Sequence, residues 1–467
     1  MPYGYFKIIS TKERQTMTDS TNKRHPLTIN TILLILVGFF ATWGEGMQHV
    51  ISKASLIYPA FVAIYIVYNF NSFKSIVRSQ QIVPKEFKAL YLFITIHTVL
   101  YLLFNYQTIG FGTESGDVND AGFAYGKTEN GIVIVRYFMF LIFSLYLAVD
   151  LRSDDKLRKF SFAYITGFIF TIIGGAYNNY ANDLMRFSGG LKDPNAMAFD
   201  ALFALIISVY LFNSNLSKTV KVYVVFSIII DLLAIFLSFS RGAYLALVIW
   251  SLLYFVRKGL IKNFMRIAMG VALFVIIGSI ATNKMGVDVE TLQERFSIQE
   301  MRENKGANRG YIWEAYLSNA DKYFITGMGI GNSPKVMKGN KQGVAENYET
   351  HNLYLQFFAE FGIIGLLLYL RYWKGYMKQY RITRGNEFVL ITMGGVMIIV
   401  TFFLNIDKGR TFWIVLAILN MIWVHNNYLY ISKKNEDIQN RKKISYRFDT
   451  MLCIHMLCII GTECLLL

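Results

Sequence analysis

The sequence has little of what redox, metal-dependent and nucleotide-driven enzymes use. Its three cysteines, Cys453, Cys458 and Cys464, all lie near the C-terminus and form neither a disulfide framework nor a zinc-ligand pattern. The six histidines are scattered without metal-ligand spacing. A Gly-rich phosphate loop ending in Lys and Ser/Thr is missing, which argues against ATP as the energy source. We therefore predict no metal site and no cofactor.

Acidic side chains are also scarce, 31 against 47 Lys and Arg, which gives a formal net charge of +16. Such an excess indicates nucleic-acid binding when the basic residues share one soluble face. Here they fall in alternate loops between apolar segments, which is the pattern of the positive-inside rule. The charge therefore predicts membrane topology, and no nucleic-acid partner is expected.

Long hydrophobic runs are what the chain does have. Hydrophobic residues make up 54% of it and the mean hydropathy is +0.37. Its apolar runs of roughly 17 to 22 residues are long enough to cross a hydrocarbon core. They must be helices, because lipid offers no partner to a free backbone amide and the alternation of a membrane β-barrel is missing.

The fold class predicted from these runs is an all-α polytopic membrane protein with about twelve transmembrane helices and one large extracytoplasmic loop. A loop of this length is usually functional, because connections in compact folds are short. The helices are expected near residues 28–43, 56–70, 87–104, 131–151, 161–177, 196–212, 222–239, 243–256, 267–282, 352–373, 388–404 and 412–430.

The basic residues also predict an orientation and boundaries. The leader 1–27 is expected to be cytoplasmic and retained, because no small-residue cleavage site follows it. Residues 28–282 then hold the first nine helices, and 283–350 form the large extracytoplasmic loop. The last three helices lie in 351–430, and 431–467 form a basic cytoplasmic tail with a short apolar end. Both termini are therefore predicted to be cytoplasmic.

Three helix starts on the predicted outer side carry polar residues. The pattern predicts Asp193 as a helix cap and Pro194 as the first helical residue, and Asn195 follows directly. Residues 240–242 (SRG) and 350–352 (THN) start two more helices. Since all three helices would run inward, their amide-rich ends carry partial positive charge at the outer leaflet and favour an anion.

Arginines near these helix starts strengthen the prediction of an anion site. Arg241 lies at one start, Arg309 lies in the long loop, and Arg186 with Lys192 precedes Asp193. A planar guanidinium binds two phosphate oxygens at once, which a lysine does not reproduce. The pattern predicts a diphosphate site at a lipid headgroup.

Each of these residues also has a structural interpretation. Arg241 fits an interfacial arginine whose charge snorkels to the headgroups. Arg309 fits a surface salt bridge with Glu303 or Glu314. His351 by itself fits a polar cap better than a catalyst.

Three acidic residues lie within apolar runs. Asp231 and Glu360 need a partner or a cavity, because an isolated charge in a membrane is costly. Asp200, one or two turns below Asn195, is similar. A structural pairing explains each of them as well as a catalytic role does. The turn GMGIGN at 327–332 does not match the dinucleotide fingerprint, and we interpret it as a tight turn that uses glycine's backbone freedom.

Several stretches occur in a characteristic order between about residue 178 and residue 369. They are FSGGLKDPN at 187–195, SFSRGAYL at 238–245, NRGYIWEAY at 308–316, GMGIGN at 327–332 and HNLYLQFFAEFGIIG at 351–365. Together with the large loop before His351, they resemble the O-antigen ligase and O-antigen polymerase superfamily of bacterial envelope glycosyltransferases. None of these stretches is specific by itself, and the resemblance rests on their order and their common side of the membrane.

The resemblance implies a glycosyltransferase that uses a polyprenyl diphosphate-linked oligosaccharide as donor, without a metal and with inversion at the anomeric carbon. The family's diphosphate-binding arginines match Arg241 and Arg309, and its histidine that assists acceptor attack matches His351. Arg186 is predicted as a further diphosphate ligand. The predicted supporting residues are Asp193, Asn195, Asn352 and Glu360.

The same resemblance implies a multi-pass protein of the bacterial cytoplasmic (inner) membrane. Its expected partners are the lipid-linked donor, a glycan or lipid acceptor, membrane lipids and other polysaccharide assembly proteins. The acceptor would be another lipid-linked repeat for a polymerase and the lipid A core for a ligase, while a third member type uses protein hydroxyls. The residues do not separate these activities, and we favour the polymerase because surface-polysaccharide polymerases are numerous and diverse.

A transporter or flippase for lipid-linked sugars is the rival from another class. Such transporters tend to have matching halves, with polar or broken helices at mid-membrane. In this sequence the two halves differ, the long loop occurs once, and the polar cluster lies at one face. The enzyme is therefore the preferred prediction.

Overall fold

The computed structural model describes residues 27–44, 47, 51, 54–70, 84–104, 113–114, 127–128, 130–182, 187–191, 193–259, 309–337, 349–405 and 409–427. The predicted span near 267–282, residues 1–26 of the predicted leader and the predicted tail lie outside the described residues. So do parts of the predicted loop, residues 283–308 and 338–348.

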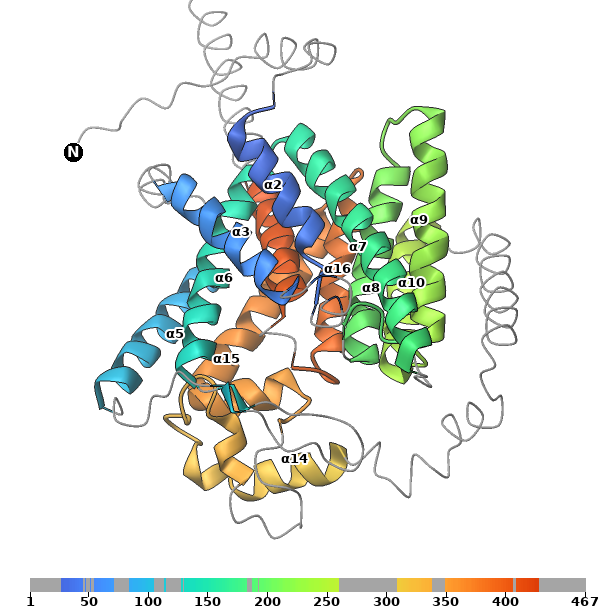
Figure 1. Ribbon diagram of the computed structural model, residues 1–467. Helices are drawn as coiled ribbons and strands as arrows, with labels where there is room; N and C mark the ends of the chain where they lie inside the picture. Colours follow the sequence, from blue (N-terminus) through green and yellow to red (C-terminus); the bar gives the residue numbers. More distant parts are fainter. Residues whose placement is uncertain are drawn as a thin grey trace, which may run out of the picture.

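Within these ranges the chain is helical, apart from two very short strands (Figure 1). The α-helices are α2 (Ile29–Phe40), α3 (Ala54–Tyr68), α5 (Lys85–Phe104), α6 (Asn130–Asp150), α7 (Asp154–Asn182), α8 (Pro194–Phe212), α9 (Lys218–Leu237), α10 (Arg241–Lys258), α14 (Arg309–Ser318), α15 (Leu353–Ile382), α16 (Glu387–Val400) and a last helix that includes 410–427. Two 3₁₀ helices are η4 (Ala320–Lys322) and η5 (Ser333–Met337). Strand β1 (Thr113–Glu114) pairs antiparallel with β2 (Lys127–Thr128).

Every predicted span that falls inside the described residues coincides with a helix. By length and composition, six of the described helices are able to cross a bilayer, namely α5, α6, α7, α8, α9 and α15. Shorter apolar helices are α2, α16 and residues 56–68 of α3. A helical architecture with six candidate membrane spans among the described residues is thus confirmed, while the number twelve and the extent of the outer loop remain predictions.

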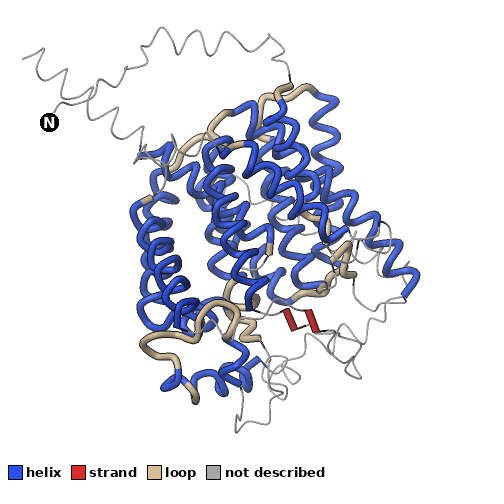
Figure 2. The backbone as a smooth tube through the Cα atoms, turned by 60° about the vertical axis from the view of Figure 1, so that its left-hand side comes forward, coloured by secondary structure: helices blue, strands red, loops and turns tan. Residues whose placement is uncertain are grey.

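The bundle has two ends, which we name by a residue at each. At the His351 end, α8, α10 and α15 begin and α14 lies beside them. At the Asp150 end, α6 finishes and α7 begins. Figures 1 and 2 both show the long helices packed side by side, with the short helices around α14 grouped beyond one end.

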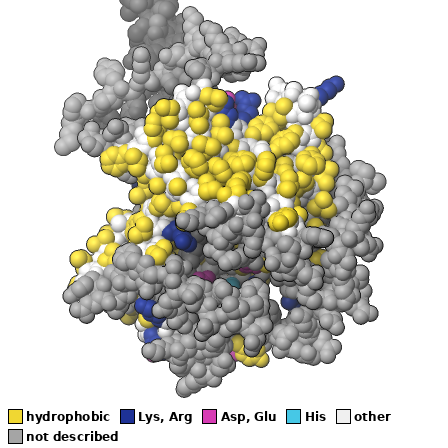
Figure 3. Space-filling view, viewed as in Figure 1, with side chains coloured by type: hydrophobic (Ala, Val, Ile, Leu, Met, Phe, Trp, Pro, Cys, Tyr) yellow, Lys and Arg dark blue, Asp and Glu magenta, His cyan; other side chains and the backbone are white. Residues whose placement is uncertain are grey.

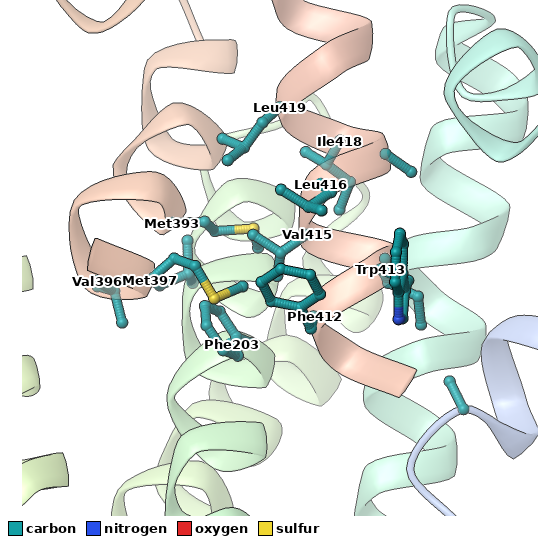
Figure 4. Packing of buried hydrophobic residues seen from close by; sticks show 14 of the residues in the cluster. Phe203, Met393, Val396, Met397, Phe412, Trp413, Val415, Leu416, Ile418 and Leu419 are labelled. Carbon is teal, nitrogen blue, oxygen red and sulfur yellow. The ribbon is translucent and has the colours of Figure 1, made fainter. Parts of the chain in front are cut away.

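The core lies where α8 is surrounded by its neighbours. Nearly every residue of α8 after its first turn is buried, and the helix packs against α7, α9, α10 and α16. In Figure 4, Phe203 of α8 meets Met393 and Met397 of α16 and Phe412 of the last helix. Since lipid is as apolar as these side chains, close packing rather than water exclusion holds such helices together.

A polar cluster joins four helices at the Asp150 end. The Asp150 carboxylate accepts hydrogen bonds from Asn30 Nδ2 of α2 at 2.9 Å and from the Tyr65 hydroxyl of α3 at 2.5 Å. Lys156 Nζ of α7 lies 2.5 Å from the same carboxylate. A charge among apolar helices is stable when it is matched in this way, so the cluster fixes the order of α2, α3, α6 and α7.

Helix α15 is interrupted near its His351 end. Gly362 has a positive φ of 66° and a ψ of −170°, which is not helical. The glycine turn at 327–331 docks at this interruption, where the backbone amides of Met328 and Gly329 donate to the carbonyls of Ala359 and Glu360 at 2.8 and 2.9 Å. The turn therefore connects α14 and η5 to the membrane helix α15.

Candidate functional site

The start of α8 has the structure that the sequence predicts. Asp193 caps the helix, its Oδ1 accepting from the Asn195 backbone amide at 2.8 Å and from Asn195 Nδ2 at 3.1 Å. Pro194 occupies the first helical position. An aspartate cap satisfies an amide that would otherwise lack a partner, and its negative charge is attracted to the positive end of the helix dipole.

The start of α10 brings Arg241 to the same end. Ser240 caps the helix by accepting from the Ala243 amide at 3.4 Å, and Arg241 is the first helical residue. The preceding residue, Phe239, has a left-handed backbone with φ of 49°. This conformation is unfavourable for a bulky residue and occurs most often where the surrounding structure holds a functional turn.

His351 occupies a second left-handed position, directly before α15. Its φ is 46°, and the next residue, Asn352, caps α15 by accepting from the Leu355 amide at 3.0 Å. The Thr350 hydroxyl accepts from the Asn352 amide at 3.2 Å, while the Trp313 indole of α14 donates to the Thr350 carbonyl at 2.9 Å. The turn is thus held from both sides, which fixes the backbone at His351.

The end of α16 closes this turn from the far side. The Leu353 amide donates to the Thr401 carbonyl at 2.7 Å, and Thr350 Oγ1 donates to Asn405 Oδ1 at 2.9 Å. Asn405 Nδ2 in turn donates to Glu349 at 3.5 Å. Residues that are about 55 positions apart therefore shape the surroundings of His351.

Phe403 lies next to Arg309 and also next to Gly242, the neighbour of Arg241. The Arg309 guanidinium lies over the Phe403 ring, 5.9 Å from its centre. A Cβ at Gly242, the neighbour of Arg241, would lie 3.6 Å from Phe403 Cβ. Phe403 thus lies between the start of α14 and the start of α10, close to both.

Electrostatic effects connect the charged residues of the site. Burial lowers the pKa of Arg309, with Asp193 raising it and Arg241 lowering it further. Burial also lowers the pKa of His351, which Glu349 raises, Arg309 lowers and Asp193 raises. Arg309 therefore lies near Asp193, Arg241 and His351, and His351 also lies near Glu349 and Asp193. Their part in anion binding stays a prediction.

Hydrophobic side chains dominate much of one face of the molecule. In Figure 3 they cover most of the upper part of this face, with a few Lys and Arg side chains at its upper edge, and small patches of acidic and histidine side chains are visible lower down. Among the residues that the structure describes, no group of three or more His, Cys, Asp or Glu is arranged to hold a metal. The arginines that gather here suit an anionic ligand, while the carboxylates of Asp193 and Glu349 offset part of their positive charge.

Glu360, another predicted site residue, has hydrogen-bond partners of its own. Glu360 is buried, and its Oε1 accepts from Ser333 Oγ at 3.0 Å and from Gln356 Nε2 at 3.1 Å. It therefore joins η5 to α15, as the structural interpretation expects. Arg186 lies outside the described residues, so its predicted part in diphosphate binding stays a prediction.

The other acidic residues of the apolar runs also have partners inside the bundle. Ser208 Oγ of α8 donates to Asp231 Oδ2 of α9 at 3.0 Å. Asp200 of α8 forms a hydrogen bond with Thr411 and lies near Arg410, at the start of the last helix. These contacts support the structural interpretation of both aspartates.

Sequence reasoning missed Arg410 at the His351 end. Its guanidinium donates to the Trp43 carbonyl and lies 4.9 Å from the centre of the Tyr58 ring. It thereby ties the last helix to α3 and to the turn after α2. A signal existed, because Arg410 is one of the few basic residues in short loops on the side that the positive-inside rule leaves poor in positive charge.

Comparison with known proteins identifies one family. Residues 226–370 match the family model described as O-antigen ligase. No curated protein matches the chain. The matched segment contains Arg241, Arg309 and His351, whereas Asp193 and Phe403 reach the same site from outside it.

Proposed function

We propose that this chain is a membrane glycosyltransferase of surface polysaccharide assembly. The premise is that residues 226–370 match the O-antigen ligase family model, which places the chain in that superfamily. The protein would transfer a glycan from a polyprenyl diphosphate-linked donor to an acceptor hydroxyl, at the outer face of the bacterial inner membrane. The observation that carries the proposal is the placement of Arg309 over Phe403, which also packs beside Gly242, the neighbour of Arg241. Arg309 is also near enough to Arg241 and to His351 for electrostatic effects between them.

Arg241 and Arg309 are assigned to the donor diphosphate. Both stand at helix starts, where the positive end of the helix dipole adds to the attraction of an anion. Arg309 is half-buried, and burial together with Arg241 makes its protonated form less stable in the free protein. A bound diphosphate would relieve this repulsion, so the charge that develops on the leaving group is stabilised without rearrangement of the site.

His351 is assigned to the acceptor. In a single displacement, the acceptor oxygen attacks the anomeric carbon while the bond from that carbon to the phosphate oxygen breaks. The hydroxyl proton passes to an imidazole nitrogen of His351, and the polyprenyl diphosphate leaves with the bonding electrons, with inversion of configuration. A base must be neutral to accept the proton, and the lowered pKa of His351 favours its neutral form near pH 7.

The remaining predicted residues have supporting parts. Asp193 holds the start of α8, with Asn195, and lies near Arg309 and His351. Asn352 holds the start of α15 directly after His351, and Glu360 joins η5 to α15. Arg186 is retained as a candidate third ligand of the diphosphate on the sequence alone. None of these groups requires a metal or cofactor in the proposed reaction.

The acceptor defines two candidate activities. Our preferred one is polymerisation, in which the acceptor is another lipid-linked glycan. The second is ligation to the lipid A core, which the description of the matching family as O-antigen ligase favours. Both use the same donor site, so the geometry around Arg241, Arg309 and His351 serves either.

Product analysis separates these candidates. Purified protein in vesicles receives a defined polyprenyl diphosphate oligosaccharide, and the products are analysed by mass. A ladder of glycans from the donor alone indicates polymerisation, and transfer that needs added lipid A core indicates ligation. Movement of labelled donor across the vesicle membrane without a new glycosidic bond would instead support a transporter and contradict the proposal.

Matched variants test the assigned residues in the same assay. Arg241→Ala, Arg309→Ala and His351→Ala are expected to lose turnover at equal amounts of folded protein. Arg257→Ala provides the control, because Arg257 lies at the opposite end of α10 and donates to the Tyr380 and Arg381 carbonyls. Near-normal turnover in all three site variants would remove the proposal.

A further inference from the structure

The segment Phe324–Gly329, between η4 and η5, runs along the membrane helix α5. His97 Nε2 of α5 contacts the Thr326 carbonyl at 2.5 Å. Three residues further along the segment and four further along α5, a Cβ at Gly329 would lie 2.6 Å from the Tyr101 ring. The segment therefore follows α5 over about one helical turn, with Thr326 at the level of His97.

The level of His97 lies inside the span of α5. The helix has 20 residues, so its length of about 30 Å equals the thickness of a hydrocarbon core. His97 precedes the final residue, Phe104, by about 10 Å along the axis at 1.5 Å per residue. Thr326 is thus at a level within the length of α5 and does not lie past the helix end at Phe104.

The backbone of the segment is satisfied by protein groups, as an environment poor in water requires. The interruption of α15 at Gly362 releases an amide and carbonyls that a continuous helix would use internally. The Ile363 amide donates to the Phe324 carbonyl at 2.8 Å, and the released carbonyls of Ala359 and Glu360 accept from Met328 and Gly329.

Glycine is required for this close fit. A Cβ at Gly362, which has a φ of 66°, would lie 2.2 Å from the Ile325 carbonyl oxygen. A Cβ at Gly327, with a φ of 68°, would lie 2.3 Å from the Glu360 carbonyl oxygen. The two backbones thus approach one another more closely than any other residue type permits.

The side chains at the tip of the segment point outward and are apolar. Phe324 is 49% exposed and Ile325 is 70% exposed. On α5, Ile96 and Leu100 flank His97 and Tyr101 and are also about half exposed, as expected of side chains that face lipid. The exposed apolar surface of the segment is therefore at the same level as that of a membrane helix.

We infer that Phe324–Thr326 is a re-entrant segment, whose Phe324 and Ile325 side chains contact the acyl chains of the leaflet at the His351 end. It anchors the group formed by α14, η4 and η5 in the membrane and thereby sets the distance of Arg309 from the lipid. The inference rests on the membrane setting of α5 and not on the proposed function, so the two fail independently.

Quenching of a site-specific label tests the inference in the full chain. Cys453, Cys458 and Cys464 are replaced by serine, Ile325→Cys is labelled with a small fluorophore, and the protein is reconstituted in phosphatidylcholine and phosphatidylglycerol vesicles. Brominated acyl chains are expected to quench this label, and aqueous iodide is expected to quench it several-fold less than a water-exposed label.

Two comparison positions calibrate the assay, and a second variant guards against misfolding. Val99→Cys on α5 marks a lipid-exposed position, and Asp321→Cys on η4 marks an exposed polar position four residues before Ile325. Phe324→Cys is measured in parallel with Ile325→Cys. Iodide quenching at 325 equal to that at 321 would overturn the inference. Protection from both quenchers would also overturn it, because the segment would then be covered by protein.

Discussion

The two ends of the bundle both hold charged side chains, but they balance them differently. At the Asp150 end, one carboxylate meets the Lys156 ammonium and hydrogen bonds from Asn30 and Tyr65. Its partners come from α2, α3 and α7, so the cluster connects helices.

At the His351 end, like charges are brought together. Burial is the largest cause that lowers the pKa values of Arg309 and His351. Asp193 raises the pKa of Arg309, which Arg241 lowers by a smaller amount, and Glu349 raises the pKa of His351, which Arg309 lowers by a smaller amount. The backbone is also strained here, with non-glycine residues in left-handed conformations at Phe239 and His351. Among the described residues, these are the non-glycine positions with positive φ.

We interpret the Asp150 end as important for stability and the His351 end as important for the proposed function. Folding favours matched charges, so the Asp150 cluster needs nothing further to be stable. Buried cations and left-handed residues cost free energy in the free protein and persist where the surrounding structure imposes them. Under the proposed function an anionic ligand would offset part of this cost, and the following predictions test whether each end has the part assigned to it.

The largest expected effect is loss of the proposed base. His351→Asn should lower turnover by about 10²- to 10⁴-fold, the usual contribution of a general base. Asparagine tolerates left-handed backbone better than alanine does, so His351→Asn should also unfold at a higher temperature than His351→Ala. Turnover and thermal unfolding are measured on the same preparations. Substantial turnover in folded His351→Asn would show that the imidazole is not the base.

The next effect tests the diphosphate ligand. Arg309→Ala should reduce turnover by about 10²- to 10³-fold, as removal of one stabilising donor does in other active sites. Arg309→Lys should recover only part of this loss, because an ammonium does not bind two oxygens side by side. Initial rates at saturating donor provide the measurement. Full recovery with lysine would indicate that position 309 supplies charge alone.

A smaller effect is expected at the Asp150 end, and on stability rather than turnover. Asp150→Asn leaves Lys156 without its counter-charge and weakens the bonds from Tyr65 and Asn30, at a cost of about 2 kcal/mol. Thermal unfolding in detergent should shift downward, while turnover per folded molecule stays normal. A selective loss of turnover in Asp150→Asn would contradict the division between the two ends.

The smallest effect concerns pH. Because a neutral His351 is needed, turnover should fall as the pH drops through the His351 pKa, which burial lowers below its ordinary value of 6.5. Glu349 raises this pKa, so Glu349→Gln should move the acidic limb of the profile to still lower pH, by one unit or less as a rough bound. Log turnover against pH in both proteins gives the shift. An unchanged or upward shift would contradict the role of His351.

Local features of the site were predictable because they depend on neighbouring residues. Asp193 followed by Pro194 specifies a capped helix start whatever surrounds it. Ser240 and Asn352 cap their helices in the same way. The glycine turn at 327–331 was also interpreted correctly, since Gly327, Gly329 and Gly331 all have positive φ.

Features that join distant residues were not predictable. The partner of Glu360 is Ser333 of η5, and the Trp313 indole closes the His351 turn. The interruption of α15 was missed because the run from Leu353 to Ile382 is apolar enough to suggest a continuous helix. Its break is stabilised by a distant segment, since the Ile363 amide donates to the carbonyl of Phe324, 39 positions earlier in the chain.

The sequence by itself determined the helices, their caps and the kind of residue available for an anion, because hydrophobic run length and capping chemistry act over a few residues. Only the tertiary structure decided that Arg309 stands near Asp193 and Arg241, that Asn405 and Trp313 hold the His351 turn, and that Arg410 joins the same end. These contacts depend on how close-packed helices meet in space, which spacing along a chain does not encode.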